Sequence, residues 1–192
     1  MVYPSTGLGL FSLVQCAEGC DYHKEACNRP NAAERERVSP IFDIRVDDLT
    51  GAAARALLTL HLGGMHEHSP PEHVYALDLE GLSGAGVTVW SVWQGTALAG
   101  IGALKELGDG AGELKSMRTD PKYLRRGVAS ALLEHIIEEA RRRGMRRLSL
   151  ETGTGPAFEP ALALYRKRRF IEGEPFANYR PSDFNRFFHL AL

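Results

Sequence analysis

The stretch of sequence that decides the fold, Glu113–Arg143, reads ELKSMRTDPKYLRRGVASALLEHIIEEARRR. It opens with a short alternating segment, which predicts a β-strand as far as Thr119, and continues through a turn at Pro121. A basic loop with one glycine leads into a long amphipathic helix over about residues 126–143. Such a strand–loop–helix unit favours phosphate binding, because unpaired backbone N–H groups and the positive end of the helix dipole point at the anion.

The predicted phosphate loop immediately precedes and begins this helix. Two of its residues, Gly127 and Ala129, are small where a ligand would need to approach the backbone. The residues expected to bind the phosphate, through backbone N–H groups and two positive side chains, are Arg125, Arg126, Gly127, Val128, Ala129 and Ser130. The alternative is an ordinary loop in which Gly127 only permits a tight turn.

Outside this stretch, the hydrophobic pattern predicts a mixed α+β domain from Ile41 to the C-terminus. Strands are expected at about residues 41–46, 87–93, 98–107, 113–119, 147–152, 170–174 and 186–192. Helices are expected at about residues 52–62, 70–79, 126–143 and 158–168. The first helix is expected to be capped by Thr50 and broken at Gly63-Gly64, and the second to begin at Ser69-Pro70.

The order of these segments predicts a sheet with one unusual pair. The three strands between residues 87 and 119 form an antiparallel meander, whereas the strand–helix–strand order places 147–152 parallel to 113–119. Two parallel strands in an otherwise antiparallel sheet are expected to splay. We therefore expect an opening beside the helix N-terminus, where an extended ligand has room.

Composition excludes several classes of function. The 192 residues are 44% hydrophobic with a net charge of −1, as in an ordinary soluble domain. No apolar run reaches the ~18–20 residues of a membrane span, so no membrane partner is expected. The basic run Arg141–Arg147 lacks interleaved aromatic residues and fits a solvated helix end, so no nucleic-acid partner is expected. Three cysteines, all before position 28, suit the reducing cytoplasm.

Residues 1–40 differ in character and predict a loosely packed or disordered N-terminal extension ahead of a domain at 41–192. Within the extension, Cys16, Cys20, His23 and Cys27 are soft ligands for Zn²⁺ in principle. Their spacing fits none of the common zinc-finger patterns, so no metal site is predicted.

The loop and its surroundings resemble the acyl-CoA-binding motif of the GNAT superfamily of N-acetyltransferases. Gly127 and Ala129 match the two small positions of that motif and Pro121 matches a frequent proline, whereas Leu124 stands where the family has Gln or Arg. The resemblance implies a mixed, mostly antiparallel central sheet with a parallel, splayed strand pair, flanked by about four helices. It also implies acetyl-CoA as co-substrate, no metal, and a possible homodimer.

The same resemblance implies two further sets of residues. The backbone of Met117, Arg118 and Thr119 is expected to pair with the pantetheine amides of the cofactor like an added strand. Tyr165 is expected to protonate the leaving thiolate, since Ala161, Leu164, Tyr165 and Phe170 are in register with a second family motif. Phe158 and Arg169 depart from that motif, and a tyrosine on an apolar helix face is otherwise part of the core.

Transfer to an amine also requires a base, because an ammonium group has no lone pair. Glu113 opens the strand that faces the expected acceptor, and members of the family commonly keep a carboxylate near this position. We expect Glu113 to act as the base, directly or through a water molecule. The alternative is that Glu113 is only a solvated charge partner of Lys115. The expected acceptor side also includes His61, His66 and Glu151.

The sequence therefore predicts direct transfer of an acetyl group from acetyl-CoA to a primary amine of a small molecule or peptide. The alternative is a non-catalytic acyl-CoA-binding or regulatory module, which would keep the Gly127 loop and tolerate loss of Tyr165 and Glu113. The identity of the acceptor has no readable code in the sequence.

Overall fold

The computed structural model describes residues 42–70 and 79–192. The chain divides into two units, Met1–Val38 and Ser39–Leu192, and every described residue belongs to the second. The predicted extension of residues 1–40, with its cysteines, lies outside the described residues. So does most of the short helix predicted to start at Ser69-Pro70.

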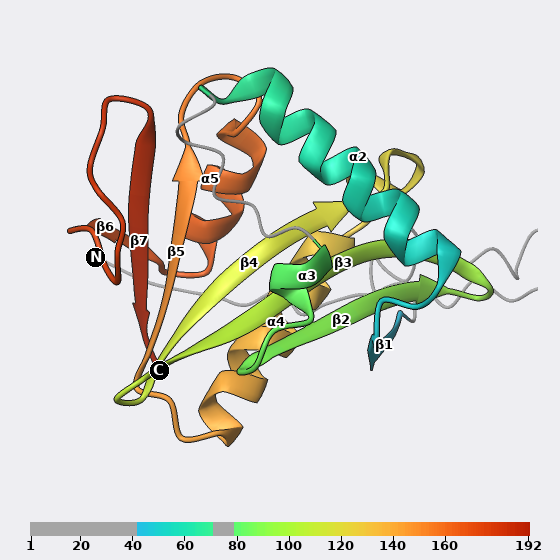
Figure 1. Ribbon diagram of the computed structural model, residues 1–192, viewed down its shortest axis with the longest axis horizontal. Coiled ribbons are helices and arrows are strands. Elements are labelled where there is room, and N and C mark those ends of the chain that lie inside the picture. Colours follow the sequence, from blue (N-terminus) through green and yellow to red (C-terminus); the bar gives the residue numbers. More distant parts are fainter. Residues whose placement is uncertain (1–41, 71–78) are drawn as a thin grey trace, which may run out of the picture. The chain divides into compact units, whose positions relative to one another are not determined.

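The described residues form one mixed sheet in the order β1-β2-β3-β4-β5-β7-β6 (Figure 1). Its strands are β1 (Asp43–Val46), β2 (Val87–Gln94), β3 (Ala97–Gly108), β4 (Ala111–Thr119), β5 (Arg147–Gly153), β6 (Ile171–Gly173) and β7 (Asn185–Ala191). All neighbouring strands are antiparallel except β4 and β5, which confirms the predicted meander and the predicted parallel pair.

The parallel pair separates soon after it begins. Pairing joins Ala111–Glu113 of β4 to Arg147–Ser149 of β5, and neither strand pairs with the other beyond these residues. The remainder of β4, from Leu114 to Thr119, is therefore open along the edge that faces β5. This is the predicted splay.

Helices cover both faces of the sheet. They are α2 (Ala52–His68), α3 (Leu79–Leu82), α4 (Val128–Arg142) and α5 (Glu159–Lys167), with a 3₁₀ turn η2 at Pro121–Tyr123. Figure 1 shows α2 on one face of β3 and β4 and α4 on the other. Of the apolar stripe predicted for α4, Ala129 is only partly buried, and the other members are buried: Val128, Leu132, Leu133, Ile136, Ile137 and Ala140. Within the described ranges, every helix falls short of the length and apolarity that a membrane crossing requires.

Two predictions about α2 are wrong. The helix does not end at Gly63-Gly64 but continues for one more turn to His68, and its N-cap is Gly51 rather than Thr50, whose hydroxyl bonds Asp48 instead. Each glycine costs a helix only about 1 kcal/mol, which packing against the sheet offsets. Gly64 also leaves space for a neighbour, because the position of its missing Cβ lies 3.6 Å from a guanidinium nitrogen of Arg118.

A β-bulge in β4 decides where its side chains point. Arg118 pairs with Ile101 and Lys115 with Ala103, so Ser116 and Met117 together oppose Gly102, and Ser116 adopts a positive φ of 51°. The bulge shifts the normal alternation by one residue. Met117 consequently packs on the α4 side, next to Gly102, whereas Lys115 and Arg118 both face the side of α2.

Two Gly→Ala substitutions should have opposite effects on stability. Gly63 is exposed within α2 with no atom near its missing Cβ, so Gly63→Ala should raise the free energy of unfolding by about 0.5–1 kcal/mol. Gly100 in β3 lies against α4, where a Cβ would stand 2.7 Å from Val128 Cγ1 and 3.1 Å from the Arg118 carbonyl oxygen. Gly100→Ala should lower the free energy of unfolding by about 1–3 kcal/mol, because the added methyl group would overpack this contact.

Urea unfolding followed by circular dichroism measures both changes. A destabilising Gly63→Ala would mean that α2 does not persist through this glycine in solution.

Candidate active site

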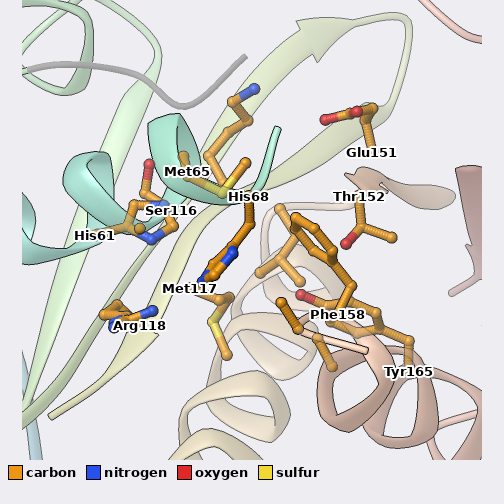
Figure 2. A pocket seen from close by; sticks show the side chains of 15 residues that line it. His61, Met65, His68, Ser116, Met117, Arg118, Glu151, Thr152, Phe158 and Tyr165 are labelled. Atoms are coloured by element: carbon orange, nitrogen blue, oxygen red, sulfur yellow. The ribbon is translucent and has the colours of Figure 1, made fainter. Parts of the chain in front are cut away.

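A pocket of about 180 Å³ opens where β4 and β5 separate (Figure 2). Its walls come from four elements: His61, Gly64, Met65 and His68 of α2, Leu114–Arg118 of β4, Glu151 and Thr152 of β5, and Ala157, Phe158, Ala161 and Tyr165 in and before α5. The splay thus brings together residues that lie about a hundred positions apart in the sequence.

Five residues expected to be functional line this pocket: His61, Met117, Arg118, Glu151 and Tyr165. His66 does not, because it is exposed and its Nδ1 lies 2.8 Å from the Leu62 carbonyl oxygen. His68 lines the pocket instead, one helical turn beyond Gly64. The seven-residue spacing of His61 and His68 would have indicated a shared face if the helix had been predicted to continue.

Tyr165 is almost fully buried, and Figure 2 shows its hydroxyl pointing into the pocket. Its ring packs against Phe170 at 5.8 Å between centroids. Burial, and secondarily the negative charge of Glu151, raises the pKa of the Tyr165 phenol to about 12. The hydroxyl therefore stays protonated over the physiological range, as a proton donor must.

Glu113 does not line the pocket but is held in a buried cluster beside it. Its Oε1 accepts a hydrogen bond of 2.5 Å from the Tyr179 hydroxyl and lies 3.2 Å from Lys115 Nζ, and Lys115 in turn donates to Tyr179 at 2.7 Å. Glu113 is only 3% exposed. Sequence reasoning did not identify Tyr179, because a partner 66 residues away leaves no local pattern.

Glu151 is the carboxylate that reaches the pocket. Burial raises its pKa to about 7, the nearby charge of Lys115 lowers it, and that of Glu113 raises it further. A pKa near neutral pH is the condition that suits a group exchanging a proton with a substrate. The sequence indicated only that Glu151 would help to shape the acceptor side.

The predicted phosphate loop lies next to the end of β4. Gly127 is the N-cap of α4 with a φ of 89°, and Arg125 also has a positive φ of 61°. Among residues 42–70 and 79–192, none accepts a hydrogen bond from the backbone N–H of Gly127, Val128, Ala129 or Ser130, since the first bond of the helix is Ala131 N–H to the Gly127 oxygen. Such a run of free donors suits an anion.

Side chains around this loop are already engaged. Ser130 Oγ accepts a 2.8 Å hydrogen bond from Arg168, which also pairs with Glu134 at 2.9 Å, and the Arg126 guanidinium lies over the ring of Tyr123. An anion at the loop would thus be held mainly by backbone groups. In the part of the chain described here, no cluster of His, Cys, Asp or Glu is arranged to hold a metal ion.

Comparisons with known proteins agree with this geometry. The model of the acetyltransferase (GNAT) family matches residues 53–170. YedL of Escherichia coli (strain K12), an uncharacterized N-acetyltransferase, is 54% identical over 152 residues, which are 79% of this chain and 96% of YedL.

Two solved structures share the fold. A Klebsiella pneumoniae protein assigned as an acyl-CoA N-acyltransferase superposes with a TM-score of 0.65 at 25% identity, covering 80% of this chain and 99% of its own. A Bacillus subtilis acetyltransferase in complex with CoA gives a TM-score of 0.58 at 19% identity, covering 79% and 99%. From the family match and the extent of identity to YedL, the chain belongs to the GNAT family of acetyltransferases.

Proposed function

We propose that this acetyltransferase moves an acetyl group from acetyl-CoA to a primary amine by direct attack. The observation that carries the proposal is that one pocket contains a carboxylate with a pKa near 7 and a protonated phenol, Glu151 and Tyr165. The free N–H groups at the start of α4 lie at the end of the strand that lines this pocket.

The cofactor is expected to lie along the open edge of β4. Its diphosphate binds the free N–H groups of Gly127–Ser130, and its pantetheine arm runs along the backbone of Met117, Arg118 and Thr119, which has no strand neighbour on the side of β5. A Bacillus subtilis acetyltransferase with this fold is a complex with CoA, which supports CoA as the kind of ligand that this fold binds.

In the reaction, the amine nitrogen attacks the thioester carbonyl carbon, a C–N bond forms and the C–S bond breaks. Glu151 accepts the proton that the amine loses, and Tyr165 donates its proton to the departing thiolate sulfur. A backbone N–H at the bulge of Ser116 and Met117 polarises the carbonyl oxygen, since a bulge releases backbone groups from the ladder.

Glu113 has a different part in this scheme. Its carboxylate accepts a hydrogen bond from Tyr179 and forms an ion pair with Lys115, and its charge raises the pKa of Glu151. We therefore assign the base role to Glu151 and an electrostatic role to Glu113. In the competing assignment, Glu113 is the base and receives the proton through a water molecule.

The proposed activity is tested by release of free CoA thiol from acetyl-CoA in the presence of a broad panel of amines, amino acids and peptides. Turnover that depends on an amine supports the transferase. A non-catalytic acyl-CoA-binding module would bind acetyl-CoA without releasing thiol with any amine.

Acetyl-CoA should stabilise the protein against heat, by about 2.7 kcal/mol at a hundredfold excess over Kd. Gly127→Glu should abolish this protection, because its carboxylate would lie among the N–H donors and repel the diphosphate. Gly144→Glu is the matched control, since Gly144 also has a positive φ and open space but stands at the opposite end of α4. Equal protection of both variants in a thermal-shift assay would contradict the site.

Tyr165→Phe should lower kcat by about 10²–10⁴-fold, because it removes the proton donor while keeping the ring that packs against Phe170. The variant should retain its thermal shift with acetyl-CoA. Unchanged kcat in a steady-state assay would remove the general-acid role.

The pH dependence of kcat/KM should have an acid limb near pH 7, because Glu151 must lose its proton to act as a base and its pKa is raised to about 7. Glu151→Gln should eliminate this limb and lower kcat/KM by about 10²–10⁴-fold.

Glu113→Gln provides the comparison. It should keep the limb but move it to lower pH, since the charge of Glu113 raises the Glu151 pKa. Loss of the limb in folded Glu113→Gln, with the limb retained in Glu151→Gln, would transfer the base role to Glu113.

A further inference from the structure

Arg118 brings a positive charge into the pocket that the described residues do not balance. Within residues 42–70 and 79–192, no side chain forms an ion pair with its guanidinium or accepts a hydrogen bond from it, and its Nε is fully buried without a partner. A buried donor of a charged group is costly to leave unsatisfied. The arrangement is therefore suited to an incoming anion.

Two features of the backbone hold Arg118 in this position. The bulge at Ser116 and Met117 turns its side chain toward α2 instead of α4, and Gly64 of α2 lacks the Cβ that would crowd the guanidinium, which lies 3.6 Å from that position. In Figure 2, Arg118 and His61 lie on one side of the pocket, whereas Glu151 and Tyr165 lie on the other. The cation thus stands opposite the acid–base pair.

The other charged groups at the pocket do not pair with Arg118, and the pocket carboxylate Glu151 lies on the far side from it (Figure 2). Lys115 is paired with Glu113 at 3.2 Å, so these two charges offset one another. Burial, followed by the charges of Arg118 and Lys115, lowers the pKa of His61 to about 4, so the imidazole is neutral. His61 is available as a neutral hydrogen-bonding group beside the cation.

The cofactor phosphates are expected elsewhere. The free N–H groups that suit the diphosphate belong to Gly127–Ser130, at the start of the helix on the α4 face. The carbonyl oxygen of Arg118 lies beside Gly100 of β3, whereas its guanidinium lies against Gly64 of α2, on the face of the sheet opposite to α4. The side chain of Arg118 is therefore on the other face of the sheet from the N–H groups expected to bind the diphosphate.

We propose that the acceptor is a small amine that also bears a carboxylate, as an α-amino acid does, and that Arg118 binds the carboxylate while the amine faces Glu151. This inference rests on the proposed acetyl transfer. A pocket of about 180 Å³ fits a small molecule, and a guanidinium forms two parallel hydrogen bonds with a carboxylate. Specificity would come from this contact, since the carboxamide analogue leaves Arg118 unsatisfied.

A binding experiment tests the site without relying on turnover. The probes are the N-acetyl derivatives of the twenty standard amino acids and their C-terminal carboxamides, titrated calorimetrically into protein saturated with CoA. At least one carboxylate should bind, and its carboxamide should bind about 10-fold or more weakly. Arg118→Gln should remove this difference, and Arg118→Lys should restore only part of it, because an ammonium group lacks the planar fork.

The matched control is Arg141→Gln, which removes the same charge from the exposed end of α4, outside the pocket, and should leave probe binding unchanged. Absence of binding by every carboxylate, or equal binding by wild type and folded Arg118→Gln, would overturn the proposal.

A kinetic experiment separates this proposal from the proposed function. Free amino acids, their carboxamides and O-phosphoethanolamine are compared as acceptors in the thiol-release assay. Arg118→Gln should lower kcat/KM for the carboxylates by about 10²-fold and change that for the carboxamides little. Efficient use of carboxamides or of the phosphate compound by the wild type would refute the carboxylate assignment alone. Absence of thiol release with every amine would refute the transferase, while the binding result still decides the role of Arg118.

Discussion

The early separation of β4 and β5 is the constraint on which the rest of the structure depends. The two parallel strands share only three paired positions before they diverge. The open edge of β4 then offers unpaired backbone to a ligand, and the space between the strands becomes the pocket that α2 and α5 close from opposite sides. A sheet that stayed paired along both strands would have neither the pocket nor the edge.

The charged groups around this opening differ in their partners. The buried cluster of Glu113, Lys115 and Tyr179 neutralises itself and ties the segment before β7 to the central strand. Glu151, next to it, has no such partner among the residues that the structure describes, and burial raises its pKa to about 7. Two carboxylates on neighbouring strands thus differ in their surroundings, because Glu113 is hydrogen-bonded within the cluster whereas Glu151 is desolvated at the pocket.

Local patterns predicted the parts of the fold that depend on local physics. The apolar stripe of α4, the meander and the parallel crossover follow from periodicity and chain order, and each is confirmed. The continuation of α2 beyond Gly63-Gly64 was not predicted, because packing on the sheet overrides a weak intrinsic preference. The bulge at Ser116 was not predicted, because this segment of β4 contains no glycine or proline that would indicate a bulge. The pairing of Glu113 with Tyr179 joins distant segments, which no single-sequence pattern records.

Arg168 connects α5 to α4, and this connection affects how the two helices can move. It stands at the C-terminal end of the helix that bears Tyr165, and it grips both Ser130 and Glu134 in the first two turns of α4. Arg168 therefore links the helix that bears Tyr165 to the first two turns of α4, which begin at the turn proposed to bind phosphate. If the cleft widens to admit or release a molecule, the proposed proton donor and the proposed phosphate-binding turn should move together, which would preserve their alignment.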